Sequence, residues 1–123
     1  MFKIKQLSAL EILDSRGRPT IRTGCRLARG YQGMASVPSG ASTGKAEAIE
    51  LRDGDPKRYR GLGCRQAVRN VNETLNRALS GRSFAGQIEL DRALLELDGS
   101  SNKSRLGANT ILSVSLAFAR AAA

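Results

Sequence analysis

The spacing of the apolar residues changes once along the chain, and this change constrains the fold more than any other feature. Between residues 2 and 37 apolar residues alternate with polar ones, which is the period of a half-buried strand. From residue 64 onward they recur every three or four positions, which is the period of a helix that covers a core. The 123 residues are enough for one domain, so strands and helices are expected to share a single core.

The first strand is predicted over residues 2–12. Its residues Ile4, Leu10 and Ile12 are expected to face the core. Glu11 is expected on the solvent face, together with the neighbouring lysines.

Two more strands are predicted over residues 21–27 and 31–37. Gly17 and Pro19 break regular structure before the second strand, and a short connection containing Gly30 precedes the third. Such short connections favour an antiparallel meander of three strands.

Helices are predicted over residues 64–79, 87–97 and 106–123, with a shorter one over residues 45–51. The last helix is more apolar than one exposed along a side, so it needs cover on several faces. The predicted fold is therefore α+β, a three-stranded antiparallel meander followed by a helical bundle, in one domain over residues 1–123.

The composition excludes several classes of function. The net charge of +9 makes a polyanion a partner to consider, but the basic residues are spread along the chain, aromatics are few and no nucleic-acid motif occurs. The sequence thus argues against nucleic acid. It contains no apolar run long enough for a membrane span, and a cytoplasmic protein is expected. Cys25 and Cys64 have no histidine to assist them, so buried reduced thiols are expected.

A glycine-rich stretch superficially resembles a phosphate-binding P-loop. The match fails because Ser39 stands where the first glycine is required. It fails again at Ala46, where a serine or threonine must bind magnesium.

Some carboxylates could in principle do chemistry. Asp53 and Asp55 flank Gly54 with a spacing that could touch a divalent cation, although a turn with solvated acids is the simpler interpretation. Glu47 and Glu50 could supply a base, but no partner group is evident, so a solvated face is expected.

Short blocks of residues, in order along nearly the whole chain, resemble one family. Residues 12–17 (ILDSRG), followed one residue later by Pro19 and Thr20, are similar to the opening signature of enolases, and residues 36–44 (SVPSGASTG) are similar to their mobile active-site loop. Further similar blocks lie at residues 50–55, 67–72, 97–99, 102–103, 106–109 and 111–117. The chain resembles the N-terminal domain of the enolase (phosphopyruvate hydratase) family.

The resemblance implies a division of labour between two domains. Enolases interconvert 2-phosphoglycerate and phosphoenolpyruvate by removing a proton next to a carboxylate, with two magnesium ions. The family's C-terminal barrel carries the lysine base, its acidic partner and the ligands of the first magnesium. No part of the barrel is in this chain. The chain is therefore expected to hold no catalytic residue and to be inactive unless a barrel is supplied in cis or in trans.

The N-terminal domain, by the same resemblance, contributes a lid over the substrate. Ser42, through its hydroxyl and backbone oxygen, is expected to complete the shell of the second magnesium. A loop hydroxyl that caps a turn is the alternative role for Ser42, and a buried, paired structural role is the alternative for Arg16. The predicted lid consists of Ser39, Gly40, Ala41, Ser42, Thr43 and Gly44.

The sequence also departs from the family pattern. Arg22 stands where enolases commonly have a glutamate facing an arginine of the other subunit, and like charges there would repel. This argues against the usual homodimer. The chain also stops in Ala121–Ala123 without a capping residue, which suggests a truncation.

Two other hypotheses compete with an enolase lid domain. The chain could be a non-catalytic module that binds a polyanion or an enolase partner, and steeply salt-dependent binding would favour the polyanion. It could instead be a truncated relic, which degraded downstream DNA would favour.

Overall fold

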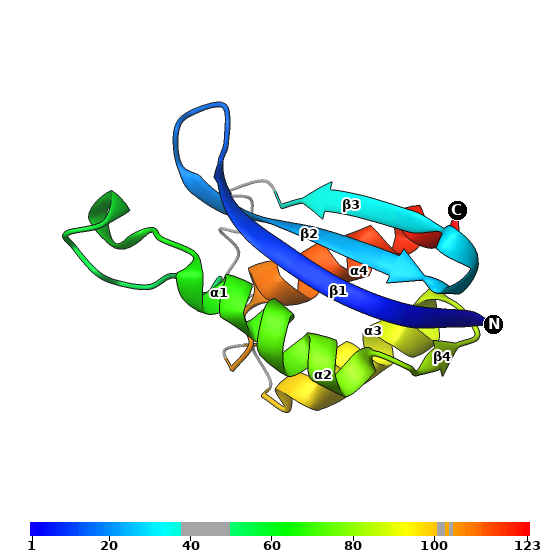
Figure 1. Ribbon diagram of the computed structural model, residues 1–123. Coiled ribbons are helices and arrows are strands. Elements are labelled where there is room, and N and C mark those ends of the chain that lie inside the picture. Colours follow the sequence, from blue (N-terminus) through cyan, green and yellow to red (C-terminus); the bar gives the residue numbers. More distant parts are fainter. Residues whose placement is uncertain (38–49, 101–102, 104) are drawn as a thin grey trace.

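The sheet confirms the predicted α+β fold and adds a fourth strand to it. The computed structural model describes residues 1–37, 50–100, 103 and 105–123. Its antiparallel sheet has the strand order β3-β2-β1-β4 (Figure 1). The unpredicted β4 is only two residues long. The strands are β1 (Phe2–Leu13), β2 (Pro19–Leu27), β3 (Gln32–Ser36) and β4 (Ser83–Phe84).

The three longer helical predictions are confirmed. The first is a continuous helical segment whose central part is π-helical. The predicted helix at residues 45–51 lies mostly outside the described residues, and Glu50 and Leu51 are in no regular element. The helices are α1 (Arg65–Arg69), the π-helical η3 (Asn70–Leu75), α2 (Asn76–Leu79), α3 (Gln87–Asp98) and α4 (Ala108–Ala122), with short 3-10 turns η1 (Ala28–Gly30) and η2 (Tyr59–Gly61).

The predicted faces of β1 are correct at Ile4 but wrong in the part of the strand that follows it. Leu10 is 64% exposed instead of buried. Glu11, expected in solvent, pairs across the sheet with the buried Ile21, and its side chain is only 15% exposed. The cause is an irregularity in the register between Ile4 and Gln6, because one inserted residue moves every later side chain to the opposite face.

The free edge of β1 is covered by side-chain amides of the helical segment. Asn72 accepts a hydrogen bond from the Ala9 N–H (2.8 Å) and donates one to the Ala9 carbonyl (3.2 Å). Asn76 accepts another from the Leu7 N–H (2.9 Å). These amides satisfy the edge as a further strand would, which prevents pairing with another chain.

Helix α4 lies against β2 and β3 on one face of the sheet (Figure 1). Phe118 is fully buried and makes edge-on ring contacts with Phe2 and Phe84, at centroid distances of 5.9 and 6.3 Å. The Thr23 and Ser113 hydroxyls share a buried hydrogen bond of 2.7 Å between β2 and α4. The cover predicted for this apolar helix is thus supplied by the sheet.

The close packing of α4 depends on Gly33 of β3. A Cβ on Gly33 would lie 2.7 Å from the Ala117 carbonyl oxygen and closer still to the Ala121 nitrogen. Both atoms belong to the helix backbone, which cannot move without shifting α4. Only glycine therefore fits at this crossing.

We expect Gly33→Ala to lower the free energy of unfolding by about 1–3 kcal/mol, because the added methyl pushes α4 from the sheet. Gly24→Ala is the matched control, since its Cβ would make only ordinary contacts, with the Ser8 hydroxyl at 3.5 Å and with Met34 at 4.0 Å. Urea unfolding followed by circular dichroism measures both. Equal stabilities of the two variants would contradict this packing.

Candidate functional site

The predicted lid, Ser39 to Gly44 with Ser42, lies outside the described residues. The structure does describe the residues that precede and follow this segment. On the N-terminal side, the Val37 N–H donates to the Ile21 carbonyl (3.2 Å), and the Thr20 hydroxyl donates to the Val37 carbonyl (2.5 Å). Val37 and Thr20 are both buried, so this end is held to β2.

The C-terminal side is held by Asn109 in the first turn of α4. Its side-chain amide makes a reciprocal pair with Leu51: the Leu51 N–H donates to Oδ1 (2.9 Å), and Nδ2 donates to the Leu51 carbonyl (3.1 Å). Asn109 is only 3% exposed. Gly107 also approaches Leu51 so closely that a Cβ there would lie 2.5 Å from the Leu51 side chain. The backbone of Leu51 is thus fixed to the N-terminal end of α4.

Arg52 then connects this segment to the β1–β2 hairpin. Its guanidinium donates to the Pro19 carbonyl (2.6 Å) and to the Leu62 carbonyl (2.9 Å). The same side chain forms an ion pair with Glu50 at 3.0 Å. Glu50 was expected on a solvated face, but its carboxylate is paired with the Arg52 guanidinium. A single arginine joins the hairpin and both sides of the loop that follows residue 50.

Glu11 of β1 is the acceptor at the centre of this region. Arg58 donates two hydrogen bonds to its carboxylate, the longer of them 3.0 Å. The Cys64 N–H donates a third (2.5 Å). The Arg58 guanidinium holds the pKa of Glu11 below its ordinary value, with a smaller contribution from the Cys64 amide. Glu11 is thus a charged structural acceptor with its oxygens already occupied.

Asp53 caps the first turn of α1, which corrects the expectation that it is a solvated acid. Its carboxylate accepts from the N–H groups of Arg65 and Gln66, both at 2.9 Å, which have no partner inside the helix. Arg58 lies 3.7 Å from it. Asp55 does close a turn, as expected, since it accepts from the Lys57 N–H at 2.9 Å.

A cavity of about 440 Å³ lies beside these residues, next to the C-terminal end of the undescribed segment. Four of its charged residues, Arg52, Asp53, Asp55 and Arg58, are engaged in the contacts just described. Among the described residues, no group of three or more His, Cys, Asp or Glu side chains could hold a metal ion. The residues that line this cavity are Leu51, Arg52, Asp53, Asp55, Arg58, Arg65, Gln66 and Arg69.

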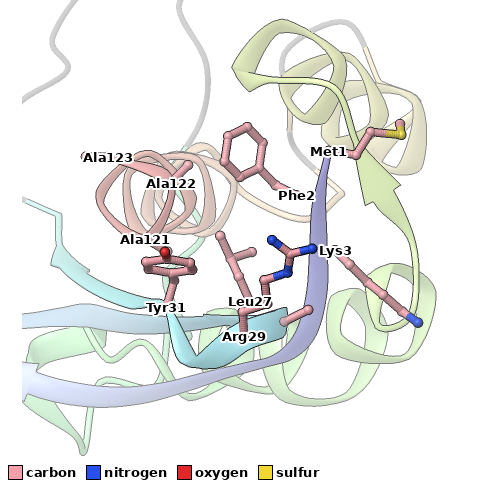
Figure 2. Close-up of a pocket in the computed structure, with 10 residues that line it drawn as sticks. Met1, Phe2, Lys3, Leu27, Arg29, Tyr31, Ala121, Ala122 and Ala123 are labelled. Carbon is pink, nitrogen blue, oxygen red and sulfur yellow. The ribbon is translucent and has the colours of Figure 1, made fainter.

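A second cavity, of about 550 Å³, lies at the opposite end of the sheet, where β1 begins and α4 ends. Figure 2 shows the Tyr31 ring beside Ala121 and the Lys3 side chain extending away from α4. The described lining of this cavity contains no carboxylate side chain. This cavity is far along the sheet from the ends of the predicted lid.

The two cysteines are buried and free, as predicted. Burial raises the pKa of each thiol to about 11. For Cys64 this holds although Arg52 lies 3.0 Å from its sulfur. Neither thiol is therefore a ready nucleophile at neutral pH.

Arg16 does not have the buried position that was considered for it. It lies at the tip of the β1–β2 hairpin, its side chain is 57% exposed, and its guanidinium is 3.9 Å from Asp14. No direct role in a site follows from this placement.

Three residues of the framework were missed from the sequence alone: Glu11, Arg58 and Asn109. Glu11 was assigned to the wrong face of its strand, and Arg58 stands alone in a polar loop without a recognisable pattern. Asn109 lies in one of the enolase-like blocks, which gave a signal for the position but not for its contact with Leu51.

Comparison with known proteins identifies the family of this chain. Residues 4–123 match the family described as "Enolase, N-terminal domain". The chain belongs to this family. Among its relatives are the enolase of Legionella pneumophila (strain Lens), 59% identical over 120 residues, and "Enolase 1" of Chlorobaculum tepidum, 56% identical over 121 residues. The enolase of Mycoplasma pneumoniae is 55% identical over 123 residues.

The enolase relatives are much longer than this chain. The matches cover 98–100% of the chain but only 27–28% of each relative. The chain thus corresponds to about a quarter of a relative's length. Among the described residues of this enolase N-terminal domain, no helix is long and apolar enough to cross a membrane. The cytoplasmic location stays a prediction.

We expect Asn109→Ala to lower the free energy of unfolding by about 2 kcal/mol, because it leaves the Leu51 N–H and carbonyl without partners. The matched control is the next residue. The Thr110 hydroxyl is buried and has no hydrogen-bond partner within the described part of the chain, so Thr110→Val should be neutral or slightly stabilising. Thermal unfolding of both variants tests this. If Thr110→Val lowers the free energy of unfolding as much as Asn109→Ala does, the hydrogen bonds between Asn109 and Leu51 are not the cause of the loss.

Proposed function

We propose that this chain is the lid-bearing N-terminal domain of an enolase that dehydrates 2-phosphoglycerate to phosphoenolpyruvate. Membership of the enolase family supports this most strongly. The similarity of its relatives extends over almost the whole chain, so the proposal does not rest on a short motif. The base and the first magnesium site would come from a barrel domain, in cis or in trans.

The framework around the predicted lid supports the proposal physically. A lid must be anchored firmly at both ends while its middle adapts to the substrate. Val37 is held to β2, and Leu51 is held to Asn109 in α4. The segment between them is rich in glycine, serine and alanine, which order with little steric strain.

Ser42 is the residue proposed to act in this lid. Its hydroxyl and backbone oxygen are the hard ligands that magnesium prefers, and bound magnesium would stabilise the charge that develops on the substrate carboxylate. Closure of the segment would also exclude water from the reacting carbon.

The test is a chimaera in which this chain replaces the matching N-terminal part of the Legionella enolase. We expect it to form phosphoenolpyruvate, and Ser42→Ala to lower kcat on the order of 100-fold, because a lid ligand is lost. Ser83→Ala, an exposed serine in β4, is the matched control and should leave kcat unchanged.

Two results would count against the proposal. The first is a folded chimaera without activity. The second is a Ser42→Ala chimaera as active as the parent at every magnesium concentration, which would remove Ser42 from the metal site while leaving the domain assignment intact.

A further inference from the structure

Two adjacent residues at the start of β2, Pro19 and Thr20, hold the chain on both sides of residues 38–49. The Thr20 hydroxyl donates to the Val37 carbonyl (2.5 Å). The Arg52 guanidinium donates to the Pro19 carbonyl (2.6 Å). Because the Cα atoms of neighbouring residues are only about 3.8 Å apart, these two contacts fix the two sides relative to each other.

Arg52 makes the second of these attachments, and its side chain is only 17% exposed. It also donates to the Leu62 carbonyl (2.9 Å), and its Nη1 lies 3.0 Å from the Cys64 sulfur. Glu50 accepts from its other terminal nitrogen at 3.0 Å. A guanidinium holds several donors in one rigid plane, so it binds these acceptors together, whereas the single nitrogen of a lysine cannot replace it.

The first attachment is shielded from water. Thr20 is 3% exposed and Val37 is 4% exposed. A buried carbonyl that loses its donor is left without a partner, because water does not take the donor's place. The Thr20 contact is therefore a strong constraint on the position of Val37.

Fixing the two sides close together has a consequence for any event that orders the chain between them. A segment whose ends are already held loses less conformational entropy on ordering than one whose ends are free. The contacts of Thr20 and Arg52 would therefore make ordering of the intervening chain less costly.

We infer that Arg52 is a positioning residue for the reaction: it sets one end of the lid-bearing segment against Pro19, beside the end that Thr20 holds. This inference rests on the function proposed above. Arg52 acts through the backbone of Pro19 and not through contact with the substrate. Its loss would raise the cost of ordering equally in the ground state and the transition state, which raises KM and leaves kcat unchanged.

A purely structural role for Arg52 predicts a different result. Its loss would then lower the fraction of folded chain, which lowers the apparent kcat per mole of protein without changing KM. The two roles are therefore separated by which kinetic constant changes.

The experiment uses the chimaera with the Legionella enolase described above. We expect Arg52→Met to raise KM for 2-phosphoglycerate by at least about fivefold, with kcat within about twofold of the parent. Arg52→Lys should raise KM by at least about threefold, because the charge is kept but the planar fork is lost. It replaces Arg52→Met if that variant does not fold.

Two control variants should leave KM unchanged. Arg82→Met removes the same charge from an exposed residue next to β4. Gly33→Ala weakens the packing of α4 without touching Pro19 or Arg52, so it controls for a loss of stability alone. A rise in KM in Gly33→Ala as large as in Arg52→Met would overturn the inference.

Thr20→Val tests whether the two attachments act as one. If both sides must be held, either single loss removes the benefit, so the double variant with Arg52→Met should raise KM no more than about twofold beyond the larger single effect. Fully additive changes in log KM would show that the two attachments are independent, and would contradict a common anchor at Pro19 and Thr20.

Hydrogen exchange of the isolated chain gives a readout that does not depend on activity. The Val37 N–H donates to the Ile21 carbonyl, and we expect Arg52→Met to speed its exchange at least about threefold, whereas Arg82→Met should not. Unchanged Val37 exchange, or an unchanged KM, in folded Arg52→Met would overturn the inference. A folded parent chimaera without activity would reject the proposed function and with it the role of Arg52 in the reaction, while Val37 exchange would still decide whether the two sides are coupled.

Discussion

The half-buried carboxylate of Glu11 organises the region from which the proposed function would operate. Arg58 and the Cys64 amide both donate to it, so β1, the loop after residue 50 and the start of the helical segment meet at one acceptor. Asp53 extends this connection by capping α1 while lying beside Arg58. Without Glu11, the Cys64 N–H would lose its partner and Arg58 would keep only its longer ion pair, with Asp53, so a long loop would lose one of its attachments to the sheet.

Much of the fold was predictable because its signals are local. The alternation in residues 2–37 and the helical period after residue 64 gave the strands and the long helices, and Gly99, at φ 71°, closes α3 in the left-handed conformation expected of a helix C-terminus. The faces of β1 were wrong because a single irregularity after Ile4 reverses them, and no sequence pattern marks it. Strand β4 was missed because two residues carry no periodicity.

The site was less predictable because its contacts join distant parts of the chain. Glu11 and Arg58 are 47 residues apart, and Leu51 and Asn109 are 58 apart. Family resemblance gave the candidate lid from Ser39 to Gly44, but the residues that hold its ends became evident only in three dimensions. Asp53 was misjudged for the same reason, since the helix that it caps begins 12 residues later.

The central claim is that the chain on both sides of residues 38–49 is fixed to a common framework. Native-state hydrogen exchange of the Leu51 and Cys64 amides tests it most directly, since these amides donate to Asn109 and Glu11. We predict that both exchange nearly as slowly as the buried Val114 amide in α4, through global unfolding. Exchange of Leu51 and Cys64 at the rate of an unstructured chain, while Val114 stays protected, would contradict the account.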